Sequence, residues 1–506
     1  MAQGYDVVVV GGGSAGCTLA GRLAAAGACR VLVLEAGPLD WMPEILDVTS
    51  LAAGAPGHPA NWAHPVELRS GSDANIPRGR VLGGSGAVNG AVWMRATPAD
   101  GWGLPGWTWA DMLLRYVRSE ADTDFGARPG HGAAGPVPVT RPAGALLHAA
   151  AERFLAAAAA CGFPAEPDKN AGGAPGAGLV PGNAVDGVRV NPAMAYLSVA
   201  GGLDGQAAVR KAGRREDPGP LTVRGDSPAD RVVLDGTRAV GVRLADGTTV
   251  RAGEVVLAAG AVGTPHLLLR SGIGPADDLR AAGVEVRHDL PGVGRGFTDH
   301  PAVFLPFTTD DPPPHPHARA AQAALDLDAG ADPAGDCQLL LFARPFAPGG
   351  PLHVMCQLMQ PDSRGRLTLP EADGSPRISY RYLRTERDRR RLRHAVRVAA
   401  DLLRAGLGAR VGPSGADLGS DRGLDWWIAA HLTTAQHLCG TAAMGPADDP
   451  LAVVDPALRV HGIERLRVVD LSVLPVAPRR GTAATAVAVG EAGAEFLGAR
   501  PAGTAG

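Results

Sequence analysis

The first thirty-five residues combine two short apolar runs with one stretch rich in Ala and Leu. The runs, Tyr5–Val10 and Val31–Leu34, have the length and β-branched content typical of buried strands. The Ala- and Leu-rich stretch between them ends at Gly27 and predicts a helix. A glycine-rich segment, Gly11–Gly16, joins the first run to this helix. The pattern therefore predicts a strand–turn–helix–strand unit of the kind that binds nucleotides.

The glycines of this turn each have a physical reason. Gly11 allows the tight turn, Gly13 lets the backbone approach a pyrophosphate, and Gly16 lets the helix pack closely on the strand. The N-terminus of the helix offers unpaired N–H groups to the phosphates. Glu35 follows the second strand, where a carboxylate accepts hydrogen bonds from a ribose 2′-OH and repels a 2′-phosphate. The unit predicts FAD or NAD binding without choosing between them, and it argues against NADP.

The pattern of the rest of the chain predicts a mixture of helices and strands. We expect helices at Ala110–Arg118, Leu146–Cys161, Met194–Leu197, His266–Arg270 and Val487–Leu497. We expect a β-meander of four strands, followed by two further strands, at Leu221–Val223, Arg231–Leu234, Ala239–Leu244, Thr249–Arg251, Glu254–Ala259 and Arg467–Asp470. Residues 36–76 are expected to be irregular and residues 165–195 loop-like.

Strands are also predicted before residue 385. We expect one antiparallel sheet, forming a wall over the site, from Gln338–Phe346, Leu352–Gln360, Arg364–Leu369 and Arg377–Tyr382. Residues 308–335 have low complexity and are expected to be exposed. His315 and His317 lie there without the carboxylates or cysteines of a metal site, so no metal is predicted. Thr385 is expected to cap a helix whose arginines, within Arg387–Arg397, lie on its solvated face.

Composition limits the class of protein. A chain of 506 residues, 45% of them hydrophobic, is expected to form two closely joined domains. The net charge of −3 gives no reason to expect nucleic acid or an anionic membrane as a partner. Arginine outnumbers lysine by 46 to 2, which we interpret as the codon bias of a GC-rich, bacterial genome. Nothing in the sequence indicates the oligomeric state.

The cysteines and the start of the chain bear on location. The six cysteines show no C-x-x-C pair, so we expect reduced thiols in a cytoplasmic protein. The first strand begins at about residue 5, which leaves no room for a secretory leader. No apolar stretch reaches about 18 residues, so no membrane span is expected.

A second glycine-rich segment, Gly79–Gly90, suits a backbone that passes close to a planar ligand or an anion. A glycine loop without a ligand is the alternative. Together with other stretches this segment resembles the glucose–methanol–choline (GMC) family of FAD-dependent oxidoreductases. The stretches occur in the family's order, and they are Gly11–Glu35, Gly79–Asn89, Gly260–Gly274 with Pro291–Gly294 and Asp299-His300, and His437–Gly445 with Val453–Pro456 and Val468–Asp470. The sequence is also compatible with bacterial members associated with the mycofactocin redox cofactor.

The resemblance implies an α/β fold in which a Rossmann-like FAD-binding domain is interleaved with a substrate domain built on an antiparallel sheet with helices. The first would comprise residues 1–155, 215–300 and 437–506, and the second residues 156–214 and 301–436. The residues implied in FAD binding are Gly11, Gly13, Ser14, Ala15, Gly16, Glu35, Ala36, Arg80, Gly83, Gly84, Asn89, Ala229, Gly260, Asp470 and Thr482. Some members link FAD covalently through a histidine where Val88 stands here, so non-covalent FAD is predicted.

The resemblance also implies a catalytic residue. His437 stands where members have a histidine that takes the hydroxyl proton while hydride leaves for the flavin N5 atom. Imidazole suits this role because its ordinary pKa leaves it neutral at pH 7. A histidine buried in the core is the alternative, and His431 is a weaker second candidate for the base. His300 and His266 are expected to be structural.

The chain departs from the family at one position of the site. Eleven residues after Asp470, members place a second His or Asn beside the substrate oxygen, and Gly481 stands here. Thr482, Arg480 or a substrate group could take the place of that donor, or the chemistry could differ. Arg479 and Arg480 could instead bind an acidic or electron-rich substrate, or lie on the surface. Gly481 and Thr482 are therefore named with His437 as candidate catalytic positions.

The predicted function is oxidation of a small-molecule alcohol, with electrons passing from FAD to oxygen, a quinone or another carrier. One alternative is a lyase of the hydroxynitrile type that keeps FAD without net redox change. Reoxidation of a peptide-derived redox cofactor such as mycofactocinol is another. A flavin-binding protein without turnover and an NAD-dependent dehydrogenase complete the alternatives.

Overall fold

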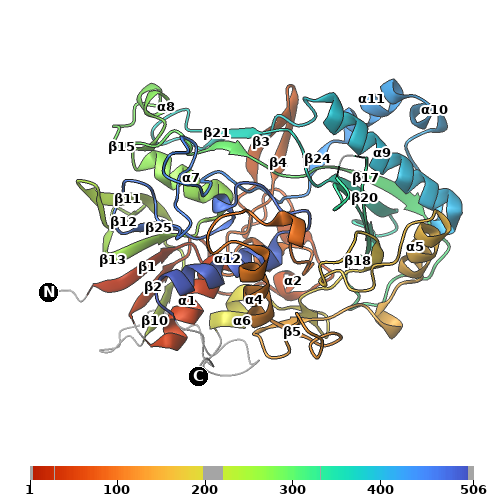
Figure 1. Cartoon of the computed structure of the whole chain (residues 1–506), viewed down its shortest axis with the longest axis horizontal. Helices are drawn as coiled ribbons and strands as arrows, with labels where there is room; N and C mark the ends of the chain where they lie inside the picture. Colours follow the sequence, from red (N-terminus) through yellow and green to blue (C-terminus); the bar gives the residue numbers. More distant parts are fainter. Residues whose placement is uncertain (1–3, 28, 198–219, 331, 500–506) are drawn as a thin grey trace.

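The computed structural model describes residues 4–27, 29–197, 220–330 and 332–499. Two seven-stranded sheets lie toward opposite ends of the molecule, with helices between and around them (Figure 1). A five-stranded sheet runs along one long side. The predicted α/β fold class is confirmed. The expected domain boundary between residues 214 and 215 lies outside the described residues.

The first sheet has a parallel core that contains the predicted nucleotide-binding unit. Five parallel strands stand in the order β10 (Leu221–Arg224), β2 (Val31–Leu34), β1 (Tyr5–Val10), β13 (Thr249–Leu257) and β25 (Leu466–Val468). Helix α1 (Ser14–Ala26) connects β1 to β2. Val7–Val10 are all buried, as expected of a parallel strand covered on both faces. The predicted βαβ unit is confirmed.

The predicted meander is wrong in two respects. β10 pairs with β2 of the parallel sheet, so it does not belong to a meander. The two strands expected at 249–251 and 254–259 are one strand, β13, which pairs first with β12 and then with β1. Only the antiparallel arrangement of β11 (Ala229–Asp235), β12 (Arg238–Leu244) and the start of β13 remains as predicted. A short apolar run does not reveal its partner strand, because pairing depends on segments far away in the sequence.

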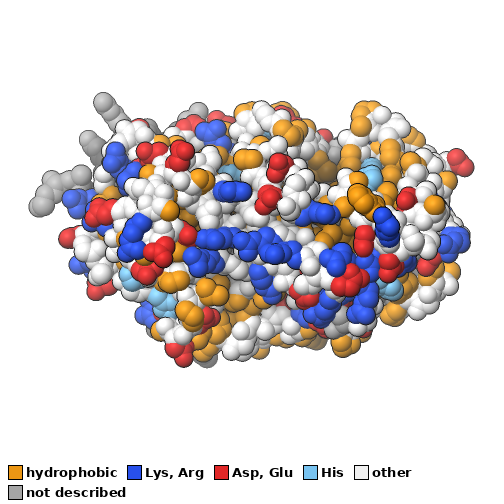
Figure 2. All heavy atoms as spheres, turned by 90° about the horizontal axis from the view of Figure 1, so that it is seen from above, with side chains coloured by type: hydrophobic (Ala, Val, Ile, Leu, Met, Phe, Trp, Pro, Cys, Tyr) orange, Lys and Arg blue, Asp and Glu red, His pale blue; other side chains and the backbone are white. Residues whose placement is uncertain are grey.

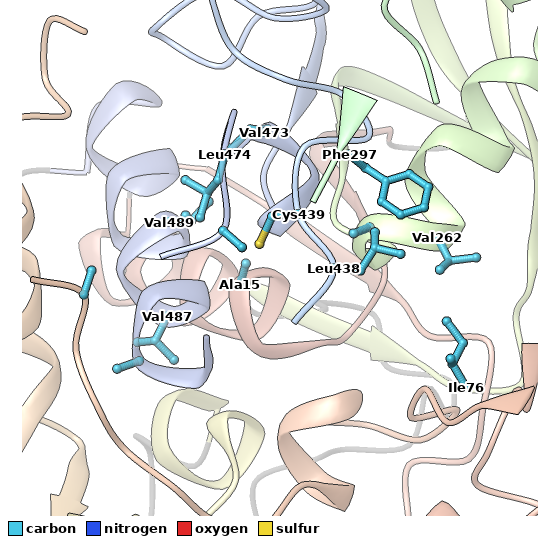
Figure 3. Packing of buried hydrophobic residues seen from close by; sticks show 14 of the residues in the cluster. Ala15, Ile76, Val262, Phe297, Leu438, Cys439, Val473, Leu474, Val487 and Val489 are labelled. Carbon is cyan, nitrogen blue, oxygen red and sulfur yellow. The ribbon is translucent and has the colours of Figure 1, made fainter. Parts of the chain in front are cut away.

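The last helix packs directly on the first. Helix α12 (Ala483–Phe496) starts four residues before the predicted helix and crosses α1. A Cβ at Gly490 would lie 2.5 Å from the Ala15 carbonyl oxygen, so glycine permits this close approach. Figure 3 shows Ala15 of α1, Val489 of α12 and Cys439 together in this buried region. Helix α7 (Gly260–Arg270) likewise starts earlier than predicted.

The second seven-stranded sheet is antiparallel. Its strands are β23 (Ala409–Arg410), β17 (Pro301–Thr308), β20 (Leu352–Leu358), β19 (Cys337–Phe342), β18 (Ala321–Leu327) and β7 (Ala177–Leu179), with β24 (Thr433–Thr434) also paired to β17. Residues 318–327, which include all of β18, are buried, so the exposed excursion expected over 308–335 is wrong for this part of it. The Ala-rich composition of β18 concealed a core strand, because small residues fit between packed layers but carry a weak strand signal.

The single sheet expected from residues 338–382 is also wrong. β21 (Gly365–Thr368) and β22 (Arg377–Ser379) belong to the five-stranded sheet, with β16 (Arg295–Phe297), β3 (His64–Arg69) and β4 (Ser72–Ile76). β3 and β4 form a hairpin within the segment expected to be irregular. The loop-like segment 165–195 likewise contains β7, β8 (Ala184–Val185) and β9 (Val188–Arg189).

Helix α9 (Glu386–Leu402) covers one face of the antiparallel sheet, with Thr385 as its N-cap. Two of its arginines contradict the expected solvated face, since Arg391 is 1% and Arg393 3% exposed. Arg391 pairs with Asp388 and Asp336, and such pairing satisfies a buried guanidinium. The remaining helices include α2 (Pro43–Leu46), α3 (Ser85–Val88), α4 (Trp109–Ser119), α5 (Ala149–Ala160), α6 (Pro192–Leu197), α8 (Ala276–Ala281), α10 (Gly415–Leu418) and α11 (Asp421–His431).

Arginine side chains form a band across the face seen in Figure 2, with acidic side chains close by. Many arginines of the described chain are in ion pairs; Asp278, for example, accepts from both Arg366 at 2.7 Å and Arg295 at 3.3 Å. The six cysteines are free thiols. Among the described helices, none has the length and apolar content needed to cross a bilayer.

Candidate active site

Two glycine-rich segments meet at the end of β1. The amide of Gly83 donates to the carbonyl of Gly12 at 2.7 Å. Gly84 has a φ of +55°, and a Cβ there would lie 2.7 Å from the Cα of Gly13, so both its conformation and its contacts favour glycine. The structure thus brings together two motifs that are about seventy positions apart in the sequence.

The N-terminus of α1 has the properties of an anion site. Its N-cap is Gly13, and no side chain caps the first turn, which contains Ser14, Ala15 and Gly16. A Cβ at Gly13 would meet one atom within 4 Å, the Ala258 carbonyl oxygen at 3.9 Å. Uncapped N–H groups, the positive end of the helix dipole and free space at Gly13 together fit a phosphate.

The side chain of Glu35 is hydrogen-bonded to the backbone of this turn. Its two carboxylate oxygens accept from the amides of Gly12 at 2.9 Å and Gly37 at 2.8 Å. Burial raises its pKa to about 7, although these amides and the charge of Arg80 act in the opposite direction. Ala36 lies between Glu35 and Gly37, and the guanidinium of Arg80 lies over the Trp62 ring.

The other predicted cofactor residues have the following contacts. The amide of Ser227 donates to the Glu35 carbonyl at 2.9 Å, which places Ala229, at the start of β11, near the acid. Asp470 accepts from the amide of Gly260 at 2.9 Å, although 210 positions separate the two residues. Burial raises the pKa of Asp470. Asn89 follows α3 and accepts from the amide of Ala91 at 2.9 Å. Their role in cofactor binding stays a prediction.

The backbone of His437 is held by a buried carboxylate. Asp299 Oδ1 accepts from the amides of His437 at 2.8 Å and His300 at 2.6 Å, and Asp299 Oδ2 accepts from the Thr434 hydroxyl at 2.8 Å. Burial raises the pKa of Asp299, while the Arg78 charge lowers it. The side chain of Cys439, in the buried region shown in Figure 3, donates to the His437 carbonyl at 3.2 Å.

The imidazoles of His437 and His300 form a direct hydrogen bond. Their Nδ1 atoms lie 2.9 Å apart, so one Nδ1 carries a hydrogen and the other accepts it. The sequence indicated only a structural role for His300, and the Asp299-His300 pair was the signal for its position beside His437. Both rings are buried, and burial lowers the pKa of His437 to about 3 and that of His300 in the same direction. Both imidazoles are therefore neutral at pH 7.

The other nitrogen of His437 faces Gly481. A Cβ at Gly481 would lie 3.7 Å from His437 Nε2 and 3.9 Å from Val92 Cγ1. The position counted from the sequence is therefore beside the candidate base. Thr482, which follows, is the N-cap of α12, and its side chain makes no cap hydrogen bond.

Arg479 and Arg480 are both engaged within the protein. Arg479 pairs with Asp100 at 2.8 Å and also with Asp332. Arg480 is 2% exposed and pairs with Asp326 at 2.8 Å and Glu166 at 3.3 Å. The sequence left two roles open for Arg480, a surface residue or a charge that binds substrate. The structure supports neither, because Arg480 is buried and paired with two carboxylates.

The other histidines considered lie elsewhere. His431 is at the exposed end of α11, where its Nδ1 is 2.8 Å from the Trp427 carbonyl oxygen. His266 Nε2 is 3.1 Å from the Gly374 carbonyl oxygen. Within the described residues, one group of side chains is close enough to share a metal ion, namely Glu120, Asp122 and His131. Arg95 and Arg141 already neutralise its two carboxylates, which disfavours a cation there.

A change at Arg78 tests the electrostatics of His437. The Arg78 charge is, after burial, the second cause of the low His437 pKa. A base must be neutral to accept a proton. The value of kcat/KM should therefore fall only at a pH well below 6.5, the ordinary pKa of histidine. Arg78→Ala removes the positive charge, which raises the pKa of His437 and moves this loss to higher pH. Arg78→Lys is the matched control and should leave the profile in place. An unchanged profile in Arg78→Ala would show that His437 protonation does not limit the reaction.

Comparisons with known proteins identify the family to which the chain is similar. Two family models, both described as GMC oxidoreductase, match residues 5–302 and residues 361–490. The chain is 39% identical to an uncharacterized GMC-type oxidoreductase of Rhodococcus erythropolis, with 97% of this chain and 98% of the relative covered. It is 31% identical to the oxygen-dependent choline dehydrogenase of Photobacterium profundum, with 97% and 93% covered. The structure of pyridoxine 4-oxidase from Mesorbium loti superimposes with a TM-score of 0.85 at 28% identity, covering 97% and 98%.

Proposed function

The chain belongs to the GMC oxidoreductase family, and from this premise we propose that it uses FAD to oxidise an alcohol, with His437 as the base. Family membership indicates FAD as the cofactor and CH–OH groups as the site of reaction. The observation that supports His437 most strongly is the orientation of its neutral imidazole. One ring nitrogen is hydrogen-bonded to His300, and the other lies beside Gly481, which has no side chain.

The turn described above fits the proposed cofactor. The N-terminus of α1 would hold the pyrophosphate, Glu35 the ribose, and Gly83, Gly84 and Asn89 the flavin side. Gly260, Asp470 and Thr482 would complete the FAD-binding site. Val88 offers no nucleophilic side chain, so we propose that FAD is bound non-covalently. Acid precipitation of the holoenzyme should then release all of the flavin into the supernatant, and yellow precipitate would contradict this.

The proposed mechanism depends on the tautomer of His437. Bound FAD supplies the hydride acceptor, its N5 atom. For Nε2 of His437 to accept the hydroxyl proton, Nδ1 must carry the ring hydrogen and donate it to Nδ1 of His300. His300 then carries its own hydrogen on Nε2 and holds the lone pair of His437 on the side of Gly481. Removal of the proton as hydride departs avoids a free alkoxide.

His300 is therefore proposed as a positioning residue. His300→Ala should lower kcat for flavin reduction by about 10–10²-fold, because the His437 tautomer and ring orientation are no longer fixed. His300→Asn supplies an amide oxygen, in place of the imidazole nitrogen, that accepts from Nδ1 of His437 and should recover most of that loss. The pH at which activity is lost should rise in His300→Ala, since a freely oriented His437 is better solvated. A purely structural role would lower the Tm of both variants without this recovery.

The same fold could support a lyase that leaves the flavin oxidised. Anaerobic mixing with substrate distinguishes the two activities, because alcohol oxidation bleaches the flavin and cyanohydrin cleavage does not. A screen that contains alcohols, polyols and redox carriers, mycofactocinol among them, also tests the proposal that a peptide-derived cofactor is the substrate. The reoxidation rate with oxygen or a quinone then identifies the electron acceptor.

We also propose that residues 1–155, 215–300 and 437–506 bind FAD, and that residues 156–214 and 301–436 bind substrate. The parallel sheet of the first group and the antiparallel sheet of the second support this division. The six free thiols support a reducing, cytoplasmic location, which cell fractionation would test.

A further inference from the structure

Gly481 is not required by its backbone. Its φ lies outside the left-handed region, and the Cβ contacts given above, at 3.7 and 3.9 Å, are ordinary van der Waals distances. A methyl group would therefore fit here without moving its neighbours. The missing side chain leaves room for a group of about that size beside Nε2 of His437.

The segment around Gly481 is anchored on both sides. Arg479 is tied to Asp100, and Arg480 to Asp326 of the antiparallel sheet. Helix α12 begins immediately after Thr482 and is buried along most of its length. These contacts hold Gly481 in its place beside His437.

The wall next to this space is apolar. One face of the antiparallel sheet contributes to a hydrophobic cluster separate from the main core, and its buried members are Val180, Ala302, Ala321, Ala324, Leu340 and Met355. Val92, the neighbour of the Gly481 position, and Ala435, two residues before His437, pack against this cluster. Phe304 and Phe342 extend the same face outward, and their rings lie 5.7 Å apart. An apolar surface thus runs away from the base along the sheet.

This surface reaches solvent at Phe346, which is 47% exposed and whose ring stacks on His353 with centroids 4.5 Å apart. Three polar side chains of this sheet are hydrogen-bonded in series: Gln357 donates to Gln338, and Gln338 donates to Asp326. The charge of Asp326 is neutralised by Lys169 and Arg480. The wall therefore suits an apolar substituent better than a charged one.

We propose that the substrate is a secondary alcohol, with its larger, apolar substituent on the sheet wall and its smaller substituent in the space left by Gly481. This inference depends on the proposed alcohol oxidation. The carbinol C–H bond breaks and its hydrogen leaves with two electrons for FAD, the O–H proton passes to His437 Nε2, and the carbon–oxygen double bond of a ketone forms. A primary alcohol has only hydrogen to place beside Gly481 and leaves that space unfilled.

The test compares matched alcohols on the FAD-loaded enzyme. Anaerobic flavin reduction is followed with 1-phenylethanol against benzyl alcohol and with 2-octanol against 1-octanol. Wild type should prefer the secondary alcohol of each pair. Gly481→Ala should lower the ratio of secondary to primary kcat/KM by about tenfold and Gly481→Val by about 10²-fold, the range that one or more methyl groups produce in an apolar pocket. Gly415→Ala, at an exposed position of α10 with open space for a Cβ, is the matched control and should leave the ratio unchanged.

Binding gives a second readout. Calorimetric titration of the oxidised enzyme should show that Gly481→Ala weakens the binding of acetophenone more than the binding of benzaldehyde. Fast reduction by primary alcohols alone, or an unchanged ratio in both Gly481 variants, would overturn this inference while alcohol oxidation stands. Flavin that no alcohol of either class reduces would overturn the proposed function and this inference with it.

Discussion

Replacing His437 with alanine is expected to lower the rate of anaerobic flavin reduction by about 10²–10⁴-fold, the usual contribution of a positioned general base. The alcohol would have to lose its proton to water, because the neutral nitrogen beside Gly481 is gone. FAD binding should be retained, since the predicted cofactor turn is formed by β1, α1 and the loop before α3. Stopped-flow absorbance measures the rate, and the visible spectrum measures the bound flavin.

The control for this substitution is His431→Ala, which removes the second histidine considered from the sequence. His431 is exposed at the end of α11, so its loss should leave flavin reduction unchanged. Equal rates in wild type and His437→Ala would reject His437 as the base. A thermal melt of the oxidised holoenzyme checks that the loss of rate in His437→Ala is not loss of fold.

Gly13→Ala is expected to separate cofactor binding from folding. The added methyl has one neighbour within 4 Å, at 3.9 Å, and the φ of Gly13 is −82°, so the flavin-free protein should melt at the wild-type temperature. The methyl nevertheless occupies the space proposed for the pyrophosphate, and overfilling a packed site costs about 1–3 kcal/mol. The Kd for FAD should therefore rise by about 10–10²-fold. Fluorescence titration of the flavin-free protein measures it.

Two further glycines provide controls. Gly173→Ala lies on an exposed loop with open space for a Cβ and should change neither Tm nor Kd. Gly16→Ala should instead lower the Tm of the flavin-free protein, because its Cβ would collide with the Gly11 carbonyl. Wild-type FAD affinity in Gly13→Ala would contradict the placement of the pyrophosphate at α1.

The first glycine turn and the apolar runs on either side of it were predicted correctly from the sequence. Val7–Val10 and the helix after Gly13 form the expected unit, because a buried parallel strand and a tight glycine turn each leave a local signature. The sequence predicted poorly which strands pair with each other. β10 lies in the parallel sheet and not in the expected meander, and β18 is buried where exposed chain was expected, since pairing and burial depend on segments far away in the sequence.

By itself the sequence determined the strand–turn–helix–strand unit and the family resemblance, because both depend on residue types at fixed spacing. The resemblance in turn implied His437 as the candidate base. Only the tertiary structure decided how the site is arranged. It placed His300 against His437, held Arg480 on Asp326 and left free space at Gly481 beside the base. These contacts join residues that lie far apart in the chain, and their geometry follows from how the two sheets and α12 pack together.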